Sequence, residues 1–172
     1  MIPEHLFLSY LSGLRLHMGV CGSIAAYKAL DLCRAFQGLG LKVGVTLSEA
    51  ACRFITPLSC TALGADPVHS SLFSEHEDIY AHLYPGQASR AFLLAPASAN
   101  SIAKAANGVA DTMLSCQVLS APCPVIVAPA MNPNLWEAEA TQENLHRLQG
   151  REQFSILPPD YGHVACGDHG TG

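Results

Sequence analysis

Asn132, an amide residue between two prolines, is the side chain in this sequence best placed to bind a ligand. It follows the apolar run 125–128, which predicts a buried strand, and Pro129 and Pro133 end that strand and stiffen the loop after it. Open α/β sheets bind ligands at the carboxyl ends of their strands. An amide there can donate to a carboxylate or accept from an amine without titrating. The alternative is that Asn132 only caps the next helix, and this segment alone leaves both interpretations open.

Hydroxyl and amide residues also stand where three other expected strands give way to helices. They are Ser23, which follows Gly22, then Ser48, then Ser98, Asn100 and Ser101. Parallel strands share their carboxyl edge, so these residues are expected to meet there, and free N–H groups at helix starts could bind a phosphate. The segments match neither GxGxxG nor the P-loop pattern, which favours a single phosphate over a pyrophosphate. Ordinary helix caps are the alternative for each segment taken alone.

Two further residues could move protons. His82 lies shortly before the apolar run 91–95 and is a candidate base, although a structural or surface histidine is the commoner case. Cys166 stands among glycines near the end of the sequence, where a thiol packs poorly but could close over a site. An inert, exposed cysteine is the alternative for that position.

The elements that must position these residues alternate along the sequence. Apolar runs predict strands, and amphipathic or capped segments predict helices between them, while residues 64–90 look irregular. The expected strands are 14–20, 42–47, 91–95, 125–128 and 154–157, and the expected helices are 24–39, 48–54, 98–106, 111–119 and 141–149. This order, with strands apolar on both faces, predicts an α/β fold with a mostly parallel sheet covered on both sides. In the first helix, Ala25, Leu32, Phe36 and Leu39 are expected to share the buried face.

The composition fits one domain that hides part of its surface. Of 172 residues, 49% are hydrophobic and 13% are charged, so an oligomer is expected. The net charge of −5 argues against a nucleic-acid-binding surface, and no apolar run reaches membrane-spanning length. Residues 1–13 are expected to be an N-terminal extension of the domain 14–172, because Glu4 and the lack of basic residues argue against a signal peptide.

The seven cysteines form an odd set without a CxxC pair. Most lie in apolar segments, where a free cysteine behaves as a small hydrophobic residue. A disulfide framework or a metal site is therefore not expected, and reduced thiols indicate the cytoplasm.

Four of these segments, taken in order, resemble the flavin-dependent cysteine decarboxylases. The motifs are Gly22–Lys28, Pro96–Lys104, Pro129–Trp136 and Ala165–Asp168, within a resemblance from residue 14 to the last residue. Leu135 departs from the methionine usual in the family, a swap of similar volume. The sequence also stops at Gly172, where family members usually continue, in many bacteria into a ligase domain.

The resemblance implies a flavodoxin-like or Rossmann-like three-layer sandwich with a parallel sheet. It implies trimers, or multiples of trimers, with FMN bound where subunits meet. The residues that match the family's FMN-binding positions are Gly22, Ser23, Ile24, Ser48, Ser98, Ala99, Asn100 and Ser101.

The resemblance also implies a reaction, most closely the decarboxylation of 4′-phosphopantothenoylcysteine to 4′-phosphopantetheine in coenzyme A biosynthesis. His82, fourteen residues before Pro96, matches the family's catalytic base. Asn132 matches the residue that grips the substrate carboxylate. Ala165 and Cys166 match the flap over the substrate, with Cys166 as the proton donor. A carbanion left by loss of carbon dioxide needs an electron sink, which FMN supplies by oxidising the thiol-bearing carbon.

Other functions use the same fold. A peptidyl-cysteine decarboxylase would accept a peptide C-terminus, and a flavin prenyltransferase would lack the combination of His82, Asn132 and Cys166. A flavoprotein reductase or electron carrier would not need Cys166. A non-catalytic, flavin-binding regulatory subunit is the alternative outside enzymes, since a shared fold does not fix an activity.

Overall fold

Six parallel strands form the central sheet of the protein, for which a computed structural model describes residues 10–73, 79–163, 167 and 169–171. The strands are β1 (Arg15–Val20), β2 (Lys42–Leu47), β3 (Val68–His69), β4 (Ala91–Ala97), β5 (Val125–Pro129) and β6 (Phe154–Ile156). Their order across the sheet is β3-β2-β1-β4-β5-β6, so the chain starts in the middle and winds outward in both directions. This is a Rossmann-like or flavodoxin-like α/β fold, as the sequence predicted.

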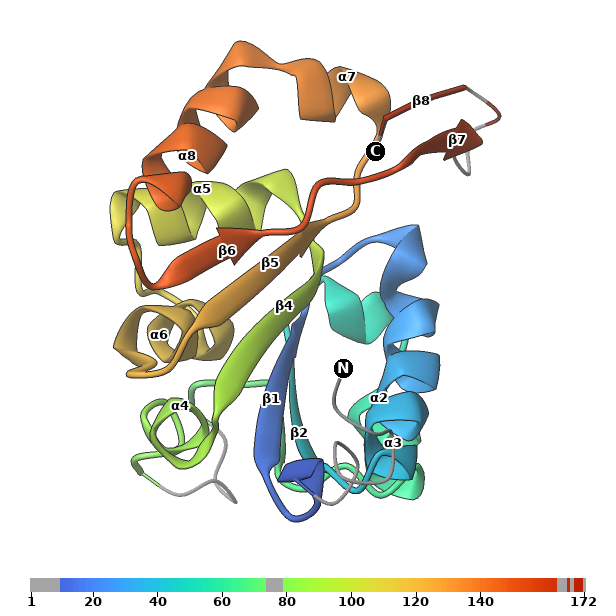
Figure 1. Ribbon diagram of the computed structural model, residues 1–172, viewed down its shortest axis with the longest axis vertical. Helices are drawn as coiled ribbons and strands as arrows, with labels where there is room; N and C mark the ends of the chain where they lie inside the picture. Colours follow the sequence, from blue (N-terminus) through green and yellow to red (C-terminus); the bar gives the residue numbers. More distant parts are fainter. Residues whose placement is uncertain (1–9, 74–78, 164–166, 168, 172) are drawn as a thin grey trace.

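Helices cover both faces of this sheet (Figure 1). The helical elements are η1 (Ile24–Tyr27), α2 (Lys28–Gly38), η2 (Ala51–Arg53), α3 (Pro57–Ala62), α4 (Tyr84–Ala88), α5 (Ala99–Asn107), α6 (Met113–Ser120), α7 (Pro133–Glu137) and α8 (Glu139–Gln149). Helices α2 and α3 lie on one face, and α5, α6 and α8 lie on the other (Figure 1). Helix α7 and an antiparallel hairpin, β7 (Tyr161–His163) with β8 (His169–Thr171), lie beyond the carboxyl ends of the strands.

The period-two alternation of the strands builds a core on each side of the sheet. Met18 and Val20 of β1 belong to the cluster that packs under α2, whereas Phe92 and Leu94 of β4 belong to the cluster under α5, α6 and α8. Met18 and Phe92 are completely buried. Burial of side chains of this size contributes roughly 2–3 kcal/mol each.

The first crossover shows where periodicity misled the sequence analysis. Ala29 and Cys33 are buried, but Leu32 and Leu39 are each 37% exposed, so the prediction that these two leucines face the core is wrong. The cause is the 3-10 turn η1, which precedes α2. A 3-10 turn has three residues per turn, so α-helical spacing counted from Ala25 loses its phase before α2 begins.

Short elements account for the other differences. The predicted helix 48–54 is only the 3-10 turn η2, where Ser48 Oγ accepts a hydrogen bond from the N–H of Ala51 at 3.1 Å. The stretch 64–90 contains β3 and α4, of two and five residues. Helix α3 was not predicted, although Thr56 caps it and Pro57 stands at its first turn.

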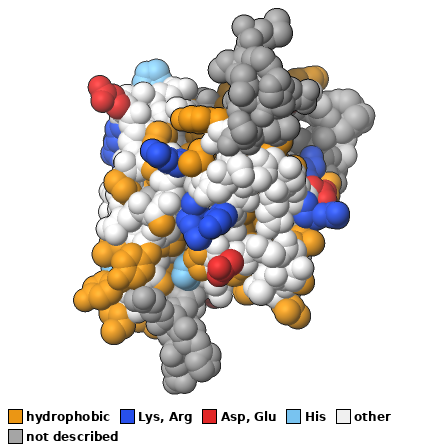
Figure 2. All heavy atoms as spheres, turned by 60° about the horizontal axis from the view of Figure 1, so that its bottom comes forward, with side chains coloured by type: hydrophobic (Ala, Val, Ile, Leu, Met, Phe, Trp, Pro, Cys, Tyr) orange, Lys and Arg blue, Asp and Glu red, His pale blue; other side chains and the backbone are white. Residues whose placement is uncertain are grey.

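The end of the molecule where the strands begin is turned toward the viewer in Figure 2. On this face, Lys, Arg, Asp and Glu side chains lie singly or in small groups of mixed sign, with hydrophobic side chains gathered at the margins (Figure 2). Within the described part of the chain, no helix is long and apolar enough to cross a bilayer.

Candidate functional site

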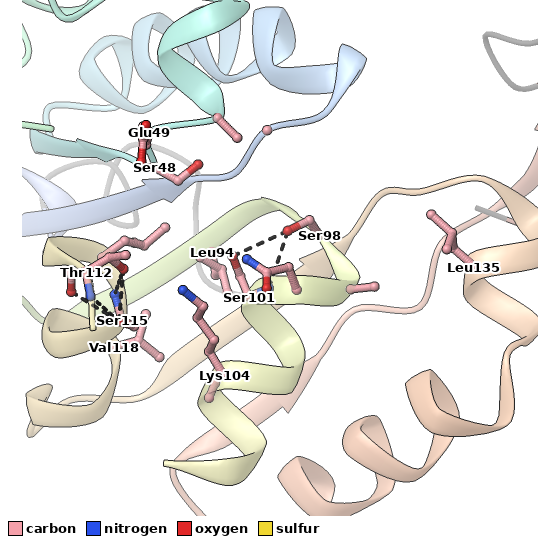
Figure 3. A pocket seen from close by; sticks show the side chains of 16 residues that line it. Ser48, Glu49, Leu94, Ser98, Ser101, Lys104, Thr112, Ser115, Val118 and Leu135 are labelled. Carbon is pink, nitrogen blue, oxygen red and sulfur yellow. Dashed lines mark hydrogen bonds between the residues drawn. The ribbon is translucent and has the colours of Figure 1, made fainter. Parts of the chain in front are cut away.

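A cavity of about 510 Å³ opens at the carboxyl edge of the sheet, between the ends of β1, β2 and β4 and the helices α5 and α6. Its volume is in the range of small-molecule sites, about 300–1,000 Å³. Ser48 and Glu49 face Ser98, Ser101 and Lys104 across it, with Thr112 and Ser115 at one end and Leu135 at the other (Figure 3). The remaining lining residues are Gly22, Ala50, Leu94, Ala99, Asn100, Ala105, Leu114 and Val118.

Most of the predicted cofactor-binding residues line this cavity. They are Gly22, Ser48, Ser98, Ala99, Asn100 and Ser101. Ser23 and Ile24 are in the turn directly after Gly22, where Ser23 Oγ accepts a hydrogen bond from the N–H of Ala25 at 3.2 Å and Ile24 is 58% exposed. The expectation that three strand ends meet at one edge is therefore confirmed, while their binding of a cofactor stays a prediction.

A buried thiol, that of Cys21 directly after β1, orients the hydroxyl groups at the start of α5. Cys21 Sγ donates to Ser101 Oγ at 3.0 Å, and Ser98 Oγ donates to the same oxygen at 3.4 Å. Burial raises the pKa of the Cys21 thiol, which keeps it protonated and able to donate. Since a hydroxyl has two acceptor lone pairs and one hydrogen, Ser101 can still donate to a ligand oxygen.

Among the described residues that line the cavity, Lys104 in the last turn of α5 carries a positive charge and Glu49 carries a negative one. Lys104 Nζ donates to both carboxylate oxygens of Asp111, at 2.7 and 2.9 Å. The hydrogen bond from Lys104 lowers the pKa of Asp111, which is exposed and therefore a weak partner. The N–H groups at the start of α5 make this edge suitable for an anionic ligand, whereas the charge of Lys104 is already offset by Asp111.

Gly22 allows two cavity-lining turns to approach closely. A Cβ at this position would lie 2.4 Å from the Cβ of Ala50 and 3.0 Å from its carbonyl carbon. Any side chain at residue 22 would therefore push the turn after β1 away from the turn after β2. Such a closely approached backbone is typical of sites that cradle a phosphate or a planar ring.

Asn132 performs the capping role that the sequence left open. Its Oδ1 accepts a hydrogen bond from the N–H of Asn134 at 2.9 Å, at the start of α7. This bond orients the amide, with its oxygen toward the backbone of α7. Leu135, in the same short helix, lines the cavity. The cap is thus confirmed, and contact with a substrate carboxylate stays a prediction.

His82 does not line the cavity within this chain. It is half-buried in the turn before α4, and its backbone carbonyl accepts a hydrogen bond from Ser120 Oγ at 3.1 Å. Ser120 is the last residue of α6, and Leu114, Ser115 and Val118 of the same helix line the cavity. The turn that carries His82 is thus attached to the end of α6, while other residues of this helix face the cavity.

Ala165 and Cys166 lie outside the described residues. The strands on either side of them, β7 and β8, pair with each other. A Cβ on Gly170 of β8 would come within 2.5 Å of Pro133, so this strand packs closely on the start of α7. The hairpin therefore approaches the loop that carries Asn132.

Four polar residues of the cavity were not predicted from the sequence. They are Glu49, Lys104, Thr112 and Ser115. Thr112 and Ser115 form a capping box at the start of α6, but Ser115 stands where the sequence signature has Glu or Gln, so the pattern does not reveal it. Among the described residues, no group of three or more His, Cys, Asp or Glu side chains could hold a metal ion.

The sequence matches the Flavoprotein family over residues 8–172. The bifunctional coenzyme A biosynthesis protein CoaBC of Escherichia coli strain K12 is 43% identical over 163 residues, which are 94% of this chain. The chain spans only 40% of the length of that relative. A probable phosphopantothenoylcysteine decarboxylase of Streptococcus mutans serotype c is 39% identical over 158 residues, which are 90% of this chain and 88% of that protein.

Solved structures resemble the fold over nearly the whole chain. The FMN-dependent cysteine decarboxylase SpaF has a TM-score of 0.81 at 30% identity, covering 94% of this chain and 91% of that one. A mutant PPC decarboxylase complexed with pantothenoylaminoethenethiol has a TM-score of 0.78 at 27% identity, covering 93% and 90%.

Proposed function

The chain belongs to the Flavoprotein family, and from that premise we propose that it decarboxylates 4′-phosphopantothenoylcysteine to 4′-phosphopantetheine with FMN as its cofactor. The observation that carries this proposal is the cavity at the carboxyl edge of the sheet, where Gly22, Ser48 and Ser98 meet. The 39% identity to a probable phosphopantothenoylcysteine decarboxylase of nearly the same length supports this choice of substrate.

The residues of the cavity fit a flavin mononucleotide. Ser98 and Ser101 supply hydroxyl groups at the start of α5, where free N–H groups favour a phosphate. Gly22 keeps the neighbouring backbone within reach of a planar ring. When bound, FMN supplies a reversible two-electron acceptor, which a cysteine carboxylate needs before it can leave as carbon dioxide.

The protein's own residues then have three tasks. His82 takes the proton that leaves the substrate during oxidation, as a general base. Asn132 donates from its NH₂ group to the substrate carboxylate and holds it in place. Cys166 returns a proton at the end, and we assign Ala165 and Cys166 to the segment that covers the substrate.

We also propose that the site is completed in a homo-oligomer, a trimer or a multiple of trimers. His82 is not among the described residues that line the cavity of its own chain, which supports a second subunit that brings its His82 to each cavity. Large apolar side chains that a subunit contact could cover lie on and near η1 and α3, where Ile24, Tyr27, Phe54 and Leu58 are 51–76% exposed.

The domain division and the compartment are proposals as well. We propose that residues 1–13 extend a flavoprotein domain formed by residues 14–172, which holds the whole sheet. We place the enzyme in the cytoplasm, because the six cysteines within the described ranges are free thiols, as a reducing compartment would keep them.

The proposed function is tested with purified protein that carries FMN. We expect flavin absorbance and release of carbon dioxide from 4′-phosphopantothenoylcysteine without added NADH. We expect His82→Asn to keep the flavin and lose the activity, since a general base contributes about 10²–10⁴ in rate. A colourless protein, or full activity in His82→Asn, would contradict the assignment.

A second candidate is the decarboxylation of a peptide that ends in cysteine. The likeness to the FMN-dependent cysteine decarboxylase SpaF, at 30% identity, favours keeping it. A peptide with a C-terminal cysteine, offered at the same concentration, distinguishes the two. Faster release of carbon dioxide from the peptide would select this candidate.

A further inference from the structure

A series of buried hydrogen bonds links two neighbouring strands, β1 and β2, to helix α6 and ends at the residue before His82. His17 Nε2 lies 2.7 Å from Thr46 Oγ1, and Thr46 Oγ1 lies 2.6 Å from Gln117 Oε1. Gln117 Nε2 in turn donates to the backbone carbonyl of Ala81 at 2.8 Å. His17, Thr46 and Gln117 are each 0% exposed, so water does not compete with these bonds.

The direction of every bond in this series follows from its last acceptor. The carbonyl of Ala81 can only accept, so the NH₂ group of Gln117 must face it. The amide oxygen of Gln117 then faces Thr46, whose hydroxyl must donate to it. Thr46 therefore accepts from His17, which must carry its hydrogen on Nε2.

The surroundings of His17 are built for this neutral tautomer. Burial lowers the pKa of His17 to about 3, and the charges of His69 and Arg15 act in the same direction. In the neighbouring strand, a Cβ on Gly44 would lie 2.6 Å from His17 Nδ1, so the absence of a side chain there makes room for the imidazole. The ring also packs beside Phe92, with ring centroids 5.1 Å apart.

Two residues of α6 hold the backbone on either side of one peptide bond. Gln117 binds the carbonyl of Ala81, and Ser120 binds the carbonyl of His82. Ala81 itself is only 2% exposed. The hydrogen bonds that Leu83 and Tyr84 donate to Tyr80, at 2.8 and 3.2 Å, close the same turn.

Catalysis by this histidine would need such a tether. Within the described part of the chain, the side chain of His82 makes no hydrogen bond, so its position depends on its backbone, which Ser120 holds. Misplacement of a catalytic group by about 1 Å can cost about a hundredfold in rate. An apolar residue at 117 would fill the same space but leave the carbonyl of Ala81 without its donor.

We propose that Gln117, oriented by Thr46 and His17, is a positioning residue that fixes the turn carrying His82 for catalysis. The inference rests on the proposed role of His82 as the base. The hydrogen bonds themselves connect β1, β2 and α6 to that turn.

Three variants test this role against simple loss of stability. Gln117→Met keeps the length of the side chain and removes the donor to Ala81. Thr46→Val removes the hydroxyl that orients Gln117, whereas Thr46→Ser keeps it. Thr141→Val is the matched control, because Thr141 is a buried threonine on α8, away from this turn.

The first readout uses the protein without FMN. Amide hydrogen exchange at Leu83 and Tyr84 is compared with exchange in β5 of the same variant, which corrects for global stability. We expect about tenfold faster exchange at these two amides in Gln117→Met and Thr46→Val, and wild-type rates in Thr46→Ser and Thr141→Val. Unchanged exchange in a folded Gln117→Met protein would overturn the tether.

The second readout uses the holoenzyme. We expect kcat to fall about tenfold or more in Gln117→Met and Thr46→Val, with KM within about twofold of wild type, because substrate contacts are not touched. Thr46→Ser, which keeps the hydroxyl, should have the kcat of the wild type. Faster exchange with unchanged kcat would refute a role in catalysis. If the wild type itself fails to decarboxylate, the proposed function falls, and the exchange rates still decide whether Gln117 holds the turn.

Discussion

Replacing Gly22 by alanine tests whether the close approach of two turns shapes the cofactor cavity. The new Cβ would lie 2.4 Å from the Cβ of Ala50, about 1 Å short of ordinary contact between carbon atoms. Both residues line the cavity, so the turns must separate by a similar distance. Overpacking of this kind costs about 1–3 kcal/mol, and hydrogen bonds to a bound phosphate would lengthen beyond their useful range.

We expect Gly22→Ala to unfold in urea with a free energy lower by about 2 kcal/mol. We expect its Kd for FMN, measured by quenching of flavin fluorescence, to rise at least about tenfold, or about 1.4 kcal/mol. Gly38→Ala is the control, because no atom lies within 4 Å of its added Cβ. That change, near the end of α2, should stabilise by about 0.4–1 kcal/mol and leave FMN binding unchanged.

A double variant isolates the contact itself. Ala50→Gly removes the atom at 2.4 Å, and the nearest remaining atoms are backbone carbons of Ala50 at 3.0 and 3.2 Å. Gly22→Ala combined with Ala50→Gly should therefore recover most of the lost FMN affinity, a coupling that a double-mutant cycle measures. Wild-type affinity in Gly22→Ala, or no recovery in the double variant, would refute the reasoning.

Three other predictions concern the fold and the site. Gly108→Ala places a side chain at φ +72°, where Gly108 ends α5, and should lower the free energy of unfolding by about 1 kcal/mol in urea titration. The pKa of His17 is about 3 in the folded protein and 6.5 when exposed, so between these values the unfolded state binds more protons and the protein loses stability as the pH is lowered. Between pH 7 and pH 5 the loss from His17 is about 2 kcal/mol, and His17→Val should show a smaller loss in the same titration. Asn132→Asp keeps a good helix cap but sets a negative charge against a substrate carboxylate, so we expect unchanged stability and a fall of kcat/KM by about tenfold or more. An equally active Asn132→Asp would remove Asn132 from the substrate site.

Long apolar strands were predictable because both faces of the sheet are covered. The strand expected at 42–47 has those bounds in the structure, and the carboxyl ends of β1, β2 and β4 meet as their parallel order requires. Elements such as β3 and α4 span two and five residues, which is too short for a hydrophobic period to be recognised. Here the fold of the rest of the chain decides the local structure.

The parts of the site that depend on distant pairs could not be predicted. Thr46 and Gln117 are 71 positions apart, and each stands within or beside an apolar run where a single polar residue gives no signal. Asn132 shows the opposite case, because its prolines and the strand before it fix its place locally. The sequence therefore predicted which residues reach the edge of the sheet, and the structure adds which buried groups hold them.

Subunit complementation tests most directly the claim that each site combines the cavity of one chain with the His82 of another. His82→Asn and Asn132→Asp are expressed together, and decarboxylation is compared with that of each variant alone. Random mixing in equal amounts restores an intact cavity with an intact His82 at about a quarter of the sites, so about a quarter of wild-type activity is expected. Activity no greater than that of the separate variants would contradict the claim.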